Sequence, residues 1–178
     1  MKAKYMLASL VNERAILDLI HDTQSLIRQN TSDGDFIPNM SPHITFVPPF
    51  FATYEYVKKL CNTFNFLLSR AENVVFSISD LNWMKSGEDI LHLPINTYPG
   101  FLTSIDQLRS HVGENLGYVN PTPSDRYYPH MTITKGIGLK EKTCKYLQDL
   151  QLTRMAGDFG VIKVFEKLPR GWVVVDVK

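Results

Sequence analysis

Two short segments, each beginning with proline and histidine, restrict the fold of this chain more than any other feature. The first is Pro-His-Ile-Thr-Phe at residues 42–46, and the second is Pro-His-Met-Thr-Ile at residues 129–133. Each follows a stretch rich in proline, asparagine and aspartate, which is typical of a loop. The two segments lie nearly half of the 178-residue chain apart. This placement predicts two units of similar pattern.

Hydrophobic periodicity predicts the same order of elements in both halves: strand, helix, loop, strand, helix, strand, with one additional closing strand in the second half. The expected strands are 4–10, 43–47, 74–84, 90–95, 130–134, 159–166 and 172–177. The expected helices are 12–30 with Asn12 as N-cap, one that Thr53 caps, 102–116 ended by Gly117, and 140–150. Pro48 and Pro49 are expected to end the strand that contains the first histidine.

The pattern therefore predicts an α+β fold in a single domain over residues 1–178, with two pseudo-symmetric lobes, roughly 1–86 and 87–178. An approximate two-fold axis between the lobes would bring the two histidine strands face to face. The net charge is +1, which argues against partners such as a long nucleic-acid tract or an acidic membrane. No stretch is long enough to span a membrane. The sequence does not indicate an oligomeric state.

The cysteine content predicts the compartment. Cys61 and Cys144 lie on expected helices and form no metal-type pair, so a reducing compartment, the cytoplasm, is predicted. The first residues, Met-Lys-Ala-Lys-Tyr-Met-Leu, resemble a signal peptide only briefly, because the apolar run is short and is followed by polar residues. We interpret them as the first strand.

The two histidine segments place an imidazole beside a hydroxyl. On a strand, residues i and i+2 share a face, so His43 lies beside Thr45, and His130 beside Thr132. Histidine titrates near neutrality, so one ring could accept a proton while the other donates one. Threonine hydroxyls can donate to phosphate oxygens. This set suits attack at phosphorus without a metal ion or other cofactor.

Three further residues are candidates for substrate contact. Tyr128 would lie on the same side as His130 if the strand begins early, and its ring could stack on a base. Arg126 could pair with a phosphate. Lys135 is a weaker phosphate-contact candidate, because strict alternation places it on the side opposite to Thr132.

Other residues of the same types are expected to be structural. His21, in a His-Asp-Thr segment, lies on an expected helix, where residues i and i+2 do not face each other. His92 could face the cleft, but it is expected to be packed or hydrogen-bonded. Phe46 is expected to belong to the core. Lys140 and its neighbouring lysines are expected to form a solvated helix face.

The two histidine segments resemble the motif of the 2H phosphoesterase superfamily, which includes the 2′-5′ RNA ligase and cyclic phosphodiesterase family. That motif is a histidine, any residue, and a threonine or serine, occurring twice on strands flanked by apolar positions. The resemblance implies a bilobal α+β fold in which two antiparallel sheets line a central cleft with helices outside. By the match, His43 and His130 would be catalytic, and Thr45 and Thr132 would bind the substrate phosphate.

The leading functional prediction is a phosphodiesterase, a hydrolase that acts on nucleotide-type phosphodiesters. Its substrate could be a 2′,3′-cyclic phosphate, a 2′-5′ linkage or a cyclic nucleotide, including the cyclic oligonucleotide immune signals that phage or viral hydrolases of this size destroy. A non-catalytic module that binds nucleotides or RNA ends is the second alternative. A metallohydrolase is the third, although neither segment has an evident carboxylate partner.

Overall fold

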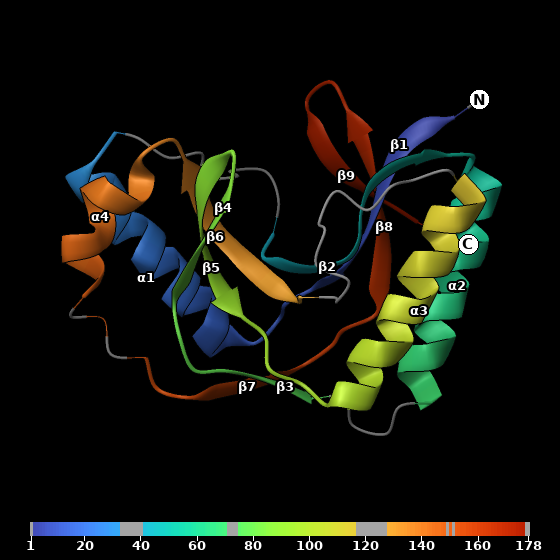
Figure 1. Cartoon of the computed structure of the whole chain (residues 1–178), viewed down its shortest axis with the longest axis horizontal. Coiled ribbons are helices and arrows are strands. Elements are labelled where there is room, and N and C mark those ends of the chain that lie inside the picture. The colour runs from blue at the N-terminus through green and yellow to red at the C-terminus, as the bar shows by residue number, and fades with distance from the viewer. Residues whose placement is uncertain are drawn as a thin grey trace.

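The structure is a computed structural model that describes residues 2–32, 41–70, 75–116, 128–148, 150 and 152–176. Gly117, the expected helix end, lies outside these residues. The elements run in the following order along the chain (Figure 1): β1 (Ala3–Leu10), α1 (Arg14–Asn30), β2 (His43–Ala52), α2 (Tyr54–Arg70), β3 (Val75–Ile78), β4 (Asn82–Ser86), β5 (Glu88–Pro94), α3 (Pro99–Leu116), β6 (His130–Gly136), α4 (Leu139–Leu147), β7 (Met155–Asp158), β8 (Ile162–Leu168) and β9 (Gly171–Val175).

The strands form antiparallel sheets, and each larger sheet takes strands from both halves of the chain. One sheet has the order β2-β1-β8-β9 and the other has the order β4-β5-β6. The third sheet is the pair β3-β7, whose members hold equivalent positions in the two halves. The two larger sheets therefore each combine strands from both of the expected units, 1–86 and 87–178. The expected α+β fold with antiparallel sheets is confirmed.

Helices from both halves also cover each sheet (Figure 1). α2 packs on β1 and β8, and α3 packs on β2 of the same sheet. α1 packs on β6, and α4 packs on β5 and on α1. The side-chain amide of Gln24 on α1 donates to the carbonyl of Ile133 on β6 at 2.8 Å, so it ties the first helix to the second histidine strand. The two units are thus interleaved.

A β-bulge occurs at the same place in both histidine strands. Thr45 and Val47 pair with consecutive residues of β1, so Phe46 between them is an extra residue. Ile133 has the same position after Thr132, because the partner strand β5 also lacks a residue opposite it. A bulge bends its strand and increases the local twist. The repeat therefore extends to the hydrogen-bond register next to each His-x-Thr segment.

Pro48 and Pro49 lie within β2 instead of ending it, so that prediction is wrong. β2 is at the edge of its sheet, and among the described strands it pairs with β1 alone. Proline is tolerated in an edge strand or at a bulge, where its missing N–H interrupts no central ladder. The register between β1 and β2 shifts along this stretch.

The expected strand 74–84 is also wrong, because β3 and β4 are separate strands in different sheets. The alternating pattern continues across the break between them, so periodicity does not reveal it. β7 was not predicted, since its sequence, Met-Ala-Gly-Asp, has too few apolar residues to alternate. The N-cap position of α1 is Glu13 rather than Asn12, and the Glu13 side chain makes no capping hydrogen bond to the helix. The Glu13 carboxylate accepts the backbone N–H of Asp158 in β7 at 2.8 Å, a contact between distant parts of the chain.

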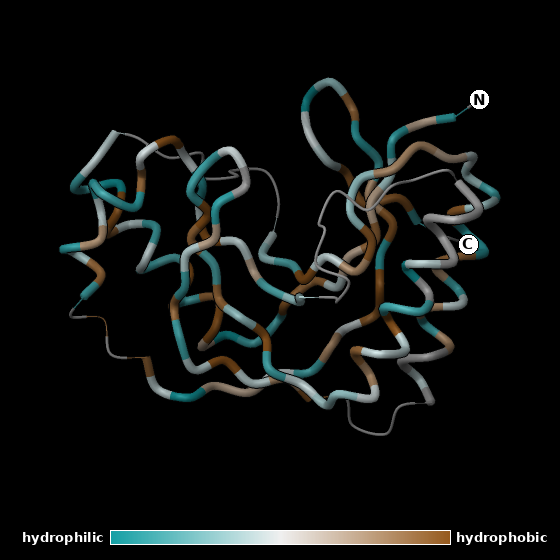
Figure 2. Tube along the Cα trace, viewed as in Figure 1, coloured by the Kyte–Doolittle hydropathy of each residue, from teal (hydrophilic) through white to brown (hydrophobic). Residues whose placement is uncertain are grey.

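Local signals predicted other features correctly. Thr53 precedes α2, and its hydroxyl accepts the backbone N–H of Tyr56 at 3.4 Å. Gly87 has a φ of +74° in the turn between β4 and β5, a conformation that favours glycine. Apolar residues are concentrated along the central strands (Figure 2). Their buried side chains form the core together with apolar side chains from the helices. Among the described residues, no helix combines the length and apolar character needed to cross a membrane.

Candidate active site

Each histidine of the two segments is held by the carbonyl group two residues before it. Nδ1 of His43 is 3.1 Å from the carbonyl oxygen of Ser41, and Nδ1 of His130 is 3.0 Å from that of Tyr128. A carbonyl only accepts hydrogen bonds, so Nδ1 carries the proton in both rings. When either ring is neutral, its Nε2 is therefore an unprotonated acceptor. The two imidazoles share one tautomer and one mode of attachment.

The two histidine strands meet although they belong to different sheets. β2 and β6 contact each other, and they approach near the centre of the molecule (Figure 1). Burial lowers the pKa of His43, its hydrogen bond to Ser41 opposes that effect, and the charge of His130 lowers the pKa further. Burial also lowers the pKa of His130. The rings are thus close enough for their charges to interact.

A threonine follows each histidine on the same side of its strand. In β2 the buried Ile44 separates half-buried His43 from half-buried Thr45. In β6, Met131 is buried in the same way between His130 and Thr132. The Thr45 hydroxyl lies 3.8 Å from the sulfur of Met6. We call His43, Thr45, His130 and Thr132 the paired-histidine site.

A third histidine, His92, contacts this site from β5. Its side chain is 1 % exposed, and it lies opposite Thr132 in the β5–β6 register. The centroid of its ring is 5.3 Å from that of His130, and its Nε2 is 3.2 Å from the hydroxyl of Tyr128. The expectation of a packed or hydrogen-bonded histidine is confirmed. The sequence offered a cleft-facing His92 as the alternative, but it did not predict the contact with His130, because nothing local in the sequence indicates that β5 pairs with β6.

Tyr128 adds an aromatic ring beside His130. Its ring is roughly parallel to the imidazole of His130, with centroids 6.0 Å apart and an interplanar angle of 30°. The side chain is 49 % exposed, so one part of the ring remains accessible. Arg126 lies outside the described residues.

Lys135 lies on the same face of the β4-β5-β6 sheet as His92. Strict alternation predicted the opposite face, and the bulge in β6 explains the difference. Lys135 pairs in register with Ile90, which shares its face of β5 with His92. The extra residue in β6 shifts the alternation by one position between Thr132 and Lys135. The ammonium group of Lys135 is 3.4 Å from the carboxylate of Glu88.

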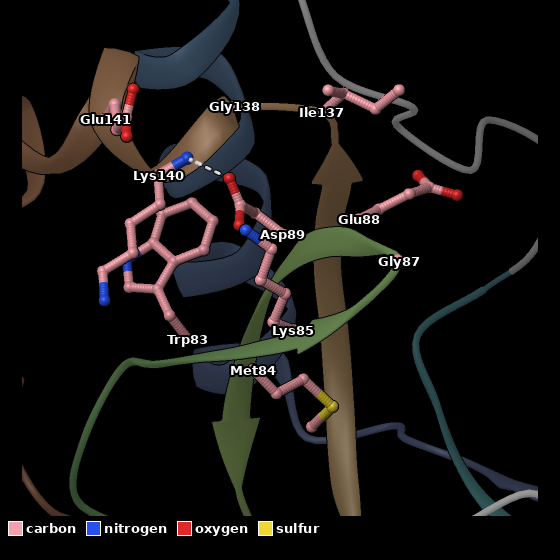
Figure 3. A pocket seen from close by; sticks show the side chains of 10 residues that line it. All are labelled: Trp83, Met84, Lys85, Gly87, Glu88, Asp89, Ile137, Gly138, Lys140 and Glu141. Atoms are coloured by element: carbon pink, nitrogen blue, oxygen red, sulfur yellow. Dashed lines mark hydrogen bonds between the residues drawn. The ribbon is translucent and has the colours of Figure 1, made fainter.

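A pocket of about 310 Å³ lies at the turn between β4 and β5, beside the start of α4 (Figure 3). Its lining includes Trp83, Lys85, Glu88, Asp89, Lys140 and Glu141, so it carries charges of both signs. The Asp89 carboxylate accepts the backbone N–H of Lys140 at 3.1 Å and so occupies the start of α4. No residue of the paired-histidine site lines this pocket. As expected, the side chains of Lys140, Lys142 and Lys145 are exposed.

The part of the chain that the structure describes holds no group of three or more His, Cys, Asp or Glu side chains that could bind a metal ion.

The fold is shared with a solved structure. The crystal structure of E. coli LigT in its apo form superposes on this chain with a TM-score of 0.57. LigT is a member of the 2H phosphoesterase superfamily, whose motif the two His-x-Thr segments resemble. The match covers 99 % of this chain and 96 % of LigT at 14 % sequence identity, so it shows a shared fold. No protein-family model matches the sequence. No curated protein sequence matches it either.

Proposed function

We propose that the chain is a metal-independent phosphodiesterase that hydrolyses nucleotide-type phosphodiesters. One observation carries this proposal: two histidines on contacting strands are held in the same tautomer, and a threonine lies beside each. The shared fold with LigT supports an enzyme of the phosphoesterase type. His43 and His130 would be the catalytic residues, and Thr45 and Thr132 would bind the phosphate.

In the proposed reaction, one neutral imidazole takes a proton through Nε2 from the attacking water or hydroxyl. The nucleophile forms a bond to phosphorus while the bond from phosphorus to the leaving oxygen breaks. The second imidazole, protonated at the outset, gives its Nε2 proton to that oxygen. The threonine hydroxyls would donate to the non-bridging oxygens, where negative charge is concentrated. The two rings end with exchanged protonation states and return to the starting state through solvent.

The substrate classes that we propose are 2′,3′-cyclic phosphates, 2′-5′ linkages and cyclic nucleotides or oligonucleotides. The net charge of +1 fits a small ligand or an RNA end better than a long nucleic-acid tract. Cys61 and Cys144 are free thiols, in keeping with a proposed location in the reducing cytoplasm.

A substrate panel with and without chelator tests this function. The purified chain is incubated with 2′,3′-cyclic, 2′-5′-linked and cyclic oligonucleotide substrates, and the products are identified by mass. We expect turnover of at least one class, unchanged by excess EDTA, because the two imidazoles supply both proton transfers. Loss of activity in EDTA that zinc or manganese restores would favour the metallohydrolase. Binding without turnover across the panel would favour a non-catalytic module.

The pH dependence of kcat/KM is expected to be bell-shaped, with its optimum below pH 6.5, the ordinary pKa of histidine. The base must be neutral and the acid must be charged, and burial lowers the pKa of both His43 and His130. A bound phosphodiester anion favours the charged imidazole, so the kcat profile should lie at higher pH than the kcat/KM profile. Both limbs belong to the pair of histidines. A single-limbed profile, or a kcat/KM optimum well above pH 7, would contradict this assignment.

A further inference from the structure

The two halves of the paired-histidine site differ at the strand position opposite the threonine. In the first sheet, Ala8 of β1 pairs with Thr45. In the second sheet, the equivalent residue is His92, which pairs with Thr132. Ala8 is fully buried, so a methyl side chain is sufficient at the position opposite the threonine in the first sheet. Packing alone therefore does not explain why the second half has a histidine here.

Both ring nitrogens of His92 have hydrogen-bond partners, and these partners define its tautomer. Its Nδ1 is 3.4 Å from the carbonyl oxygen of Ile90, so Nδ1 carries the proton and Nε2 accepts. The donor to Nε2 is the Tyr128 hydroxyl at 3.2 Å. Burial is the main cause that lowers the pKa of His92, to about 4, and the charge of His130 contributes. His92 is therefore neutral near neutral pH and remains an acceptor for Tyr128.

Tyr128 in turn contacts His130 in two ways. Its carbonyl oxygen accepts the Nδ1–H of His130, and its ring lies along the imidazole. The backbone just before each histidine makes the same hydrogen bond in both halves. The carbonyl of Pro42 accepts the N–H of Val11, and the carbonyl of Pro129 accepts the N–H of Ile95, both at 3.0 Å. The side-chain connection through Tyr128 is an addition on the His130 side.

We propose that His92 is a positioning residue that holds Tyr128 through its hydroxyl and thereby orients the imidazole of His130. This inference rests on the proposed function, in which the Nε2 of His130 must point at the reacting phosphate. His92 would touch no reacting atom. Its effect would pass through the Tyr128 hydroxyl to the carbonyl and ring that hold His130.

A double-mutant cycle tests this coupling on the full chain. Tyr128→Phe removes only the hydroxyl, and His92→Ala places at this position the residue that the first sheet carries. Each is expected to lower kcat about tenfold with a smaller change in KM, the scale of losing a bond that orients a functional group. The variant with both changes should be no slower than either single variant, because both remove the same link. His21→Ala, on the exposed side of α1, is the control and should retain wild-type kcat.

Conservative variants and a spectroscopic measurement separate positioning from packing. His92→Gln places an amide near the position of Nε2 and should restore most of kcat, whereas the shorter His92→Asn should not. Ring ¹⁵N NMR of His130 should show the Nδ1–H tautomer in the wild type, and averaged tautomers in Tyr128→Phe. Wild-type kcat and unchanged His130 signals in Tyr128→Phe would overturn the proposal, as would additive losses in the double variant.

The NMR measurement needs no substrate. If the wild type turned over none of the panel, the proposed function would fail, while the effect of His92 and Tyr128 on the His130 ring could still be measured.

Discussion

Replacement of His43 or His130 with alanine is expected to lower kcat by about 10²–10⁴-fold, the usual loss when one general acid or base is removed. Each variant removes one of the two proton transfers and leaves the other imidazole in place. The double variant should lose less than the product of the single losses, because residues that act as a unit are not additive. Single-turnover rates on a substrate that the wild type cleaves provide the measurement.

Thr45→Val and Thr132→Val are the matched comparisons for these variants. Each removes one hydroxyl near the phosphate and retains the β-branched shape, so both proton transfers remain and the loss should be smaller than for either histidine. All four side chains are only half-buried, so the variants should remain folded, which circular dichroism can check. A folded His43→Ala, His130→Ala double variant with near wild-type turnover would rule out the two-histidine mechanism.

Phe46→Ala is expected to destabilise the chain by about 3–5 kcal/mol, the usual cost of removing a buried phenylalanine ring. Phe46 is fully buried, which confirms its predicted place in the core. Its ring lies 6.1 Å from that of Phe64 on α2, 6.1 Å from that of Phe101 on α3, and 5.6 Å from that of Phe159. The ring thus joins two helices to the strand that carries His43. Because domains are stable by only about 5–15 kcal/mol, this loss is a large fraction of the total.

Urea unfolding, monitored by tryptophan fluorescence, measures the change in the free energy of unfolding. Phe51→Ala is the control, since Phe51 lies on the same strand but is 62 % exposed. Its substitution should cost less than about 1 kcal/mol, as is usual for surface positions. Equal losses in the two variants would mean that the ring of Phe46 contributes little to the core.

The sequence by itself determined the helices, many of the strands and, within the two histidine segments, the side chains that share a face. The apolar stripe of α1 and the Thr53 cap of α2 are local properties, and the sequence shows them because each depends on residues within one or two turns. The alternation in His-Ile-Thr and His-Met-Thr likewise places each threonine beside its histidine, since the side-chain period of a strand is two. The approximate repeat of elements in the two halves was visible in the sequence because it, too, consists of local patterns.

Only the tertiary structure decided which strands pair and in what register. β4 of the first half pairs with β5 of the second half, and β8 of the second half pairs with β1 of the first. The edge position of β2, which accommodates Pro48, and the contact of His92 with His130 likewise depend on partners far along the chain. Periodicity carries no information about such partners. The bulge after Thr132 turned Lys135 to the face of His92, because one unpaired residue reverses the alternation beyond it. The sequence therefore predicted which threonine lies beside each histidine, and the pairing of distant strands determined which other residues surround them.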